Sequence, residues 1–150
     1  MQSSLVGKVY GPTEPYLVGR EKIREFARAV LAQAPLSLDP VAAQAAGYAD
    51  VVAPPTFAVL IAQRAEALFL FDPEAGVDFA HLVHGSERFS QERPIVAGDS
   101  LRATTTVSRI RSLGRATMIE TTTEVVTEHA EPVSTVRASF VIEEARSDAA

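Results

Sequence analysis

The stretch that decides the fold is "TFAVLIAQRAEALFLF", residues 56–71. Its spacing predicts a helix from Phe57 to about Phe71, whose first turns are apolar on every face. A helix that is apolar all round is enclosed on all sides by the rest of the protein. Because Gln63, Arg64 and Glu66 interrupt the apolar run well before bilayer length, we expect a buried helix and not a membrane span.

The second half of the chain predicts an antiparallel sheet. Four runs are rich in Val, Ile, Thr and Phe and are separated by short turn signals: Phe79–Arg93, Leu101–Leu113, Ala116–Glu128 and Pro132–Glu143. Strands that are joined by such short turns pair antiparallel. The chain therefore predicts an α+β architecture of the hotdog type, in which an antiparallel sheet wraps around one long central helix. Domains of this type usually pair across their sheets, so we expect at least a dimer.

Two shorter helices are predicted before the long one. The first runs from Arg20 to about Ala32, and its apolar face consists of Ile23, Phe26, Ala27, Val30 and Leu31. The second runs from Val41 to Ala46, because Asp39-Pro40 is a typical helix start and Gly47 fits the position after its end. Val51–Ala53 is a short apolar run that fits a strand.

Length and composition limit the class of protein. A chain of 150 residues is most economically one domain, residues 1–150, with a frayed tail over about 145–150. The formal net charge is -5 and no run rich in Lys and Arg is present, which argues against nucleic acid as a partner. The absence of Cys excludes disulfides and thiol nucleophiles. The N-terminal residues lack the pattern of a signal peptide, so we expect a cytoplasmic protein that binds no membrane.

The segment from Ala32 to Phe57 carries a resemblance to a known family. Active MaoC-like (R)-specific hydratases and dehydratases have roughly Asp-x-Asn-Pro-Leu/Ile-His-x-Asp-Pro, then a small helix ending in Gly, then an apolar run ending in His-Gly. This chain matches the pattern without a gap at Pro35-Leu36, Asp39-Pro40 and Gly47. The runs "GREKIREFARAV" and "RFSQERPIVAGDSL" also resemble segments of that family. The resemblance covers nearly the whole chain and implies binding of 3-hydroxyacyl or 2-enoyl thioesters of CoA or acyl carrier protein.

The departures from this pattern remove the catalytic groups. The family's catalytic Asp falls on Ala32, its catalytic His falls on Ser37, and its His-Gly falls on Pro54-Pro55. Ala32 carries no proton, and Ser37 without a base is a poor acid and a poor base near neutral pH. In the family the glycine N–H polarises the thioester carbonyl, whereas Pro55 has no N–H. Losing acid–base assistance costs roughly 10²–10⁴ in rate, so we predict that this dyad site is inactive.

Two further motifs resemble those of non-catalytic subunits in heteromeric (3R)-hydroxyacyl-ACP dehydratases and enoyl-CoA hydratases. Such partners carry Ala-Pro-x-Thr-Phe in place of His-Gly, and this chain has "APPTF" at Ala53–Phe57. They also carry the turn "PIVAGD", which is present at Pro94–Asp99. This resemblance implies a MaoC-like catalytic subunit as heterodimer partner and acyl-CoA or acyl-ACP as the ligand, with no other cofactor. Two alternatives remain open: a homodimeric acyl-thioester binding protein without catalysis, and a hotdog thioesterase that uses Glu66.

Four residues are predicted to contact the substrate: Thr56, Phe57, Leu60 and His84. The first three begin the long helix, where they would border the acyl or thioester end. His81 and His84 lie three apart on a predicted strand and should point to opposite faces, so they cannot converge on one substrate. Glu66 is expected on an exposed helix face near Arg64. No His or carboxylate pair has metal-ligand spacing, so no metal is expected.

Overall fold

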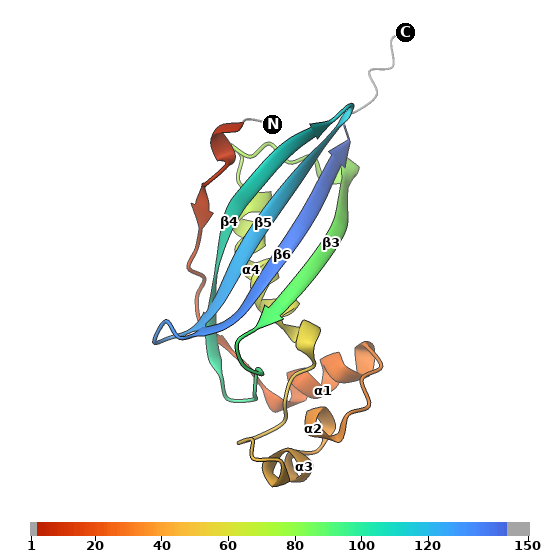
Figure 1. The fold of residues 1–150 in the computed structure, drawn as a ribbon, viewed down its shortest axis with the longest axis vertical. Coiled ribbons are helices and arrows are strands. Elements are labelled where there is room, and N and C mark those ends of the chain that lie inside the picture. The colour runs from red at the N-terminus through yellow and green to blue at the C-terminus, as the bar shows by residue number, and fades with distance from the viewer. Residues whose placement is uncertain (1–2, 144–150) are drawn as a thin grey trace.

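Four long antiparallel strands form the sheet of the computed structural model, which describes residues 3–143. Their bounds are β3 Leu82–Gln91, β4 Ser100–Leu113, β5 Ala116–Thr127 and β6 Pro132–Glu143. The order across the sheet is β1-β4-β5-β6-β3, and the two-residue strands β1 (Val9–Tyr10) and β2 (Tyr16–Leu17) both pair with β4 (Figure 1). The four predicted strands are thus confirmed. The tail predicted over about 145–150 lies outside the described residues.

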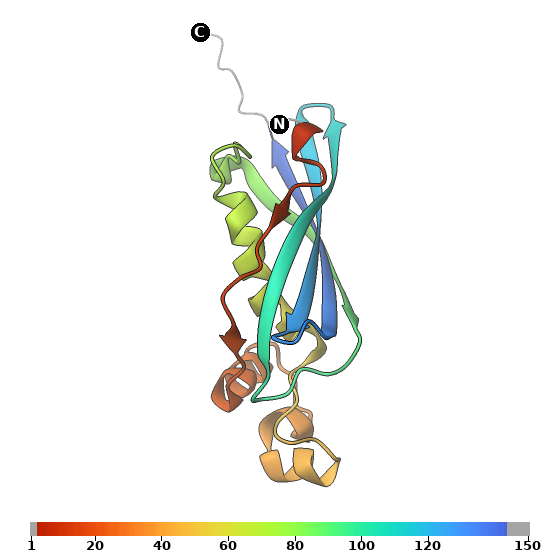
Figure 2. The ribbon, with the colours of Figure 1, turned by 90° about the vertical axis from the view of Figure 1, so that its left-hand side faces the viewer.

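The long helix crosses one face of this sheet, as the two ribbon views agree (Figures 1 and 2). It consists of a 3-10 turn, η2 Pro55–Ala58, that leads directly into α4 Val59–Leu70. Phe57, Ile61 and Phe69 on this continuous stretch are completely buried. The predicted α+β hotdog architecture, with a buried central helix, is therefore confirmed. Among residues 3–143, no helix is long and apolar enough to cross a membrane.

Three short helices, α1 Arg20–Ala29, α2 Pro35–Leu38 and α3 Pro40–Ala45, lie beyond one end of the sheet (Figure 1). The prediction that the first helix continues to Ala32 and buries Val30 and Leu31 is wrong. Leu31 adopts a left-handed backbone conformation with φ 58°, which ends the helix and turns both side chains toward solvent. Ala32 N–H then caps the helix by donating to the Ala27 carbonyl at 2.8 Å.

The segment after α1 follows the predicted pattern more closely. The Asp39 carboxylate accepts a hydrogen bond from the Val41 N–H at 2.9 Å and so caps α3. Gly47 has a φ of 95° beyond the end of that helix, which only glycine adopts without strain. Val51–Ala53 is not a strand, because only Val52 forms an isolated bridge, to Val96. The four-residue helix α2 was not predicted.

The helix side of the sheet carries two apolar clusters. One lies at the end near α1 to α3 and includes Phe57, Ile61 and Leu101, and the other lies toward the opposite end and includes Phe69 and Phe140. Polar side chains occupy the inner face between the two clusters: Thr105, Thr121, Thr123 and Glu66, all buried. The core is therefore not apolar along its whole length, which the sequence pattern did not predict.

Candidate functional site

The segment that corresponds to the family's catalytic loop packs at the start of the long helix. Its elements are held together by backbone hydrogen bonds: Val52 N–H donates to the Leu36 carbonyl at 2.8 Å, and Ala53 N–H donates to the Ile95 carbonyl at 2.8 Å. Val51 accepts from the Ala97 N–H at 3.0 Å. The extended segment 51–53 is thus fixed between α2 and the turn that precedes β4.

Ser37, which was predicted to correspond to the family's histidine, is a buried residue with a structural hydrogen bond. Its side chain is 5% exposed, and its hydroxyl donates to the Val52 carbonyl at 2.6 Å. The hydroxyl proton is therefore engaged by a backbone acceptor and ties α2 to the extended segment. A buried serine in this arrangement supplies neither an acid nor a base to a ligand.

The other two positions carry no proton-transfer group either. Ala32 is the residue whose N–H caps α1, so its place in the loop is fixed by its backbone. Pro55 is exposed and begins η2, where a residue without an N–H is well tolerated. Its carbonyl accepts a hydrogen bond of 3.3 Å from the Gln91 side chain at the end of β3. The three positions predicted to correspond to the family's catalytic groups thus offer no side-chain acid or base, and Pro55 has no N–H to donate.

The structure places the four predicted substrate contacts in different environments. Phe57 is completely buried, and its ring meets the ring of Phe26 edge-on at 5.3 Å between centroids. Thr56 is exposed beside Pro55, and Leu60 is partly buried against the same apolar cluster. Thr56 and Leu60 therefore lie at the start of the helix as expected, whereas Phe57 belongs to the core of the single chain.

The fourth predicted contact, His84, lies elsewhere. It is exposed on β3 and stacks on Phe140, with 5.2 Å between ring centroids. Six residues of β3 lie between it and Gln91, so the two are about 23 Å apart at the usual rise per residue of an extended strand. His81 is not on a strand at all, because η3 Phe79–His81 precedes β3, and its ring bonds to Asp78 at 2.7 Å. The structure thus keeps both histidines away from the start of the long helix.

The prediction that Glu66 lies on an exposed face of the helix is wrong. Its side chain is only 2% exposed and faces the sheet, while Arg64 lies over the ring of Tyr16. Burial and, to a smaller extent, the nearby Glu87 carboxylate together raise the pKa of Glu66 to about 7, against the opposing effect of the Thr121 and Thr123 hydroxyls. A carboxyl group in this environment changes its protonation state near neutral pH.

The surroundings of Glu66 leave polar atoms without partners. Glu66 Oε1, Glu87 Oε1 and Thr121 Oγ1 are buried and make no hydrogen bond within the described part of the chain. Thr123 is bonded to Thr105 at 2.7 Å between hydroxyl oxygens. Burial also raises the pKa of Glu87. We call Glu66, Glu87, Thr105, Thr121 and Thr123 the buried polar layer. Threonines at alternate positions of β5, where apolar residues were expected, were the signal in the sequence that could have revealed it.

An antiparallel sheet around one long helix, with a loop of this shape at the helix start, defines a MaoC-like hotdog domain. Residues 4–136 match the family described as FAS1-like, dehydratase domain region, and the chain belongs to that family. The match covers the loop, the long helix and most of the sheet.

Individual relatives agree with this assignment. The chain is 48% identical over 139 residues to UPF0336 protein Lxx02810 of Leifsonia xyli subsp. xyli, with 93% of each chain covered. It is similar to a chain of the C-terminally truncated HadBC (3R-hydroxyacyl-ACP dehydratase) complex of Mycobacterium tuberculosis, with TM-score 0.83 and 28% identity over 94% of this chain and 99% of that one. A MaoC-like dehydratase structure has TM-score 0.82 and 36% identity, over 95% of this chain and 43% of its own.

Proposed function

We propose that this chain is the non-catalytic subunit of a heteromeric (R)-specific 3-hydroxyacyl-thioester dehydratase or enoyl-thioester hydratase. The observation that carries this proposal is the loop itself. Its fold is held by specific bonds, including that of Ser37, while Ala32, Ser37 and Pro55 offer no proton-transfer group. A partner chain with the intact Asp and His would supply the acid–base chemistry. This chain would supply half of the dimer interface and one wall of the acyl cleft, near Thr56 and Leu60.

The free edge of the sheet supports a role in pairing. β3 is the last strand in the sheet order and has only β6 as a neighbour among residues 3–143. It presents Val83 with 59% of its surface exposed. An uncovered strand edge invites pairing with another chain. The similarity to a chain of the HadBC complex agrees with a heteromeric partner for this edge.

The proposal is tested by co-expression with a MaoC-like chain from the same genome that retains the Asp…His segment. We expect the two chains to co-purify in equal amounts and to hydrate crotonyl-CoA together. Changing the partner's Asp to Asn should lower the rate roughly 10²–10⁴-fold, whereas Ser37→Ala in this chain should leave kcat unchanged. Failure of the chains to associate, or loss of kcat in Ser37→Ala with the complex intact, would contradict the proposal.

A homodimeric acyl-thioester binding protein is the first alternative. The same purification distinguishes it, because it predicts a lone homodimer with bound acyl chain and no catalytic partner. Mass spectrometry of the extracted ligand and the native mass of the complex decide between the two.

The second alternative, a thioesterase, is favoured by one specific observation. Glu66 is a buried carboxyl group with a pKa of about 7, which lies in the range of a general base or acid. Its near-complete burial opposes this function in the single chain. If Glu66→Gln leaves acyl-CoA hydrolysis by the purified chain unchanged, the thioesterase alternative is excluded.

A further inference from the structure

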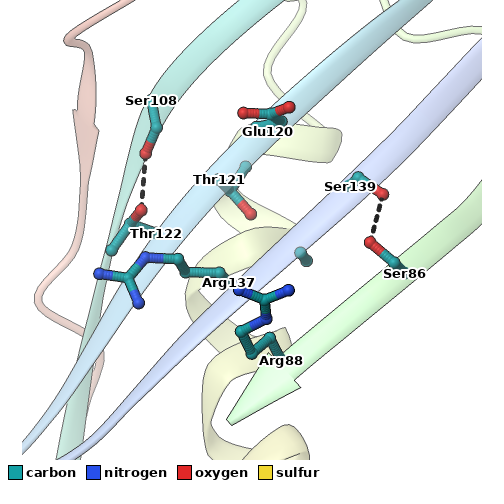
Figure 3. A pocket seen from close by; sticks show the side chains of 9 residues that line it. Ser86, Arg88, Ser108, Glu120, Thr121, Thr122, Arg137 and Ser139 are labelled. Carbon is teal, nitrogen blue, oxygen red and sulfur yellow. Dashed lines mark hydrogen bonds between the residues drawn. The ribbon is translucent and has the colours of Figure 1, made fainter. Parts of the chain in front are cut away.

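The outer face of the sheet, opposite α4, has a hollow of about 340 Å³ (Figure 3). Side chains from β3, β4, β5 and β6 line it, and nearly all of them are polar. Thr121 also belongs to the lining, although its side chain, like that of Thr123, is buried and points to the opposite face, toward α4. The hollow is therefore separate from the loop at the start of the long helix, and Thr121 is the residue that it shares with the buried polar layer.

Two arginines lie next to each other in this hollow. Arg88 on β3 and Arg137 on β6 are directly opposite in the strand register, so both side chains project from the same face. Neither guanidinium makes a hydrogen bond or an ion pair within residues 3–143, while Arg20 and Arg93, for comparison, are paired with Asp50 and Asp99. Like charges directly opposite each other on neighbouring strands are destabilising, so an anion between them would relieve a repulsion.

The rest of the lining offers hydrogen-bond donors and no competing free anion. Glu120, the carboxylate in the hollow, is held by Arg111 at 2.9 Å. Ser86 and Ser139 share one hydrogen bond of 2.8 Å, and Ser108 and Thr122 share one of 2.7 Å (Figure 3). The Ser86–Ser139 pair uses only one of its two hydroxyl protons in that bond and retains the other to donate to a ligand, whereas the Ser108 hydroxyl also donates to the Thr106 carbonyl at 3.5 Å.

We propose that this hollow binds a phosphate-type oxyanion between Arg88 and Arg137. The planar guanidinium fork matches the tetrahedral oxyanion with two parallel N–H···O bonds, and such charge-assisted bonds are the strong ones. The group is either inorganic phosphate or the phosphate ester of a larger molecule such as CoA. This inference needs neither a partner chain nor the proposed function.

The test is a titration of the isotope-labelled chain with sodium phosphate, followed by amide NMR and compared with sodium chloride at equal ionic strength. We expect saturable shifts around the hollow on β3, β5 and β6. Arg88→Gln and Arg137→Gln should each weaken binding about tenfold, the equivalent of one charge-assisted hydrogen bond. Arg88→Lys keeps the charge but loses the fork, so it should bind between wild type and Arg88→Gln. Arg28→Gln, an exposed change on α1, is the matched control and should bind as wild type.

Because both arginines are exposed, their variants should melt at or slightly above the wild-type temperature, which verifies their fold. The same titration with CoA identifies the source of the group: tighter binding than phosphate indicates an ester, and weaker binding indicates the free ion. Chloride shifts of the same size and location, or undiminished phosphate binding by the Arg88→Gln/Arg137→Gln double variant, would overturn the proposal.

Discussion

The loop at the start of the long helix and the buried polar layer beneath its middle differ in whether their polar groups have hydrogen-bond partners. In the loop the key polar groups are engaged: Ser37 bonds to Val52, and Asp39 caps α3. In the layer, one carboxyl oxygen each of Glu66 and Glu87 has no hydrogen-bond partner within residues 3–143, and the pKa of Glu66 is raised to about 7. The polar groups of the loop are thus satisfied by the fold itself, whereas the layer contains a titratable carboxyl group whose oxygens are not all satisfied within residues 3–143.

The two regions show that one segment of a fold can hold a defined conformation without proton-transfer groups while a titratable group lies in another part of the same fold. Residues that hold a loop in shape contribute to stability through bonds that are already made. A buried carboxyl group with unpaired oxygens lowers the stability of the fold. Its presence therefore indicates a role other than stability. Substitutions in the two regions test this difference through their effects on the free energy of unfolding.

The largest effect is expected for Phe57→Ala. Phe57 is completely buried against Phe26, so its removal should lower the free energy of unfolding by about 3–5 kcal/mol. Thr56→Ala, at the exposed neighbouring position, should change it by less than about 0.5 kcal/mol. Urea denaturation of both variants measures the difference. A Phe57 variant as stable as wild type would mean that this ring is free for a ligand and is not part of the core.

The next effect concerns the pH dependence of stability. The folded-state pKa of Glu66 is about 7, whereas its ordinary value is 4.5. Between these two pH values the native state keeps the Glu66 proton, while the unfolded state has released it. The contribution of this bound proton to the free energy of unfolding is fully present below pH 4.5 and is lost as the pH rises to about 7. It amounts to on the order of 3 kcal/mol in total.

Glu66→Gln should remove this slope, and Glu120→Gln on the outer face is the control that should retain it. Denaturation midpoints at several pH values between 4.5 and 7.5 provide the measurement. If the slope survives in Glu66→Gln, another group is responsible and the layer is not the titrating region.

Ser37→Ala should have a smaller effect on stability. It leaves the buried carbonyl of Val52 without its hydroxyl donor, which costs about 1–3 kcal/mol in the free energy of unfolding. Ser37→Thr, which keeps a hydroxyl, is the matched comparison in the same denaturation series. Stability equal to wild type in Ser37→Ala would show that the hydroxyl does not hold the loop together.

The smallest of these effects is expected for Asp39→Ala. Removing the cap of α3 should cost about 1 kcal/mol, and Asp39→Asn, which retains a capping oxygen, should recover most of it. Thermal unfolding of the two variants side by side makes the comparison. An equal loss in both variants would assign the effect to the negative charge and not to the capping bond.

Much of the fold could be predicted because its patterns are long. The apolar run that begins at Phe57 and the Thr- and Val-rich strands each extend over ten or more residues, so their periods are clear. β1, β2 and α2 have two, two and four residues, which is too short for a period to be detected. The end of α1 was missed because it depends on the left-handed conformation of Leu31, a residue that rarely adopts it.

The burial of Glu66 was missed for a different reason. The first turns of the long helix are apolar on every face, so the sequence does not define which face of the later turns meets the sheet. Tertiary contacts with β5 set that orientation. For the loop, the empty dyad positions were visible from the sequence, but the hydroxyl bond of Ser37 to a carbonyl fifteen residues away was not.

The prediction that the loop carries no catalytic acid or base is tested by measuring the hydration of crotonyl-CoA by the purified chain alone. Loss of the acid–base pair lowers the rate roughly 10²–10⁴-fold, so we expect hydration at least about 100-fold slower than that of an active MaoC-like hydratase. The preparation must be free of contaminating hydratase, as judged by mass spectrometry. Hydration by the single chain at a rate comparable to that of an active MaoC-like hydratase would contradict the account.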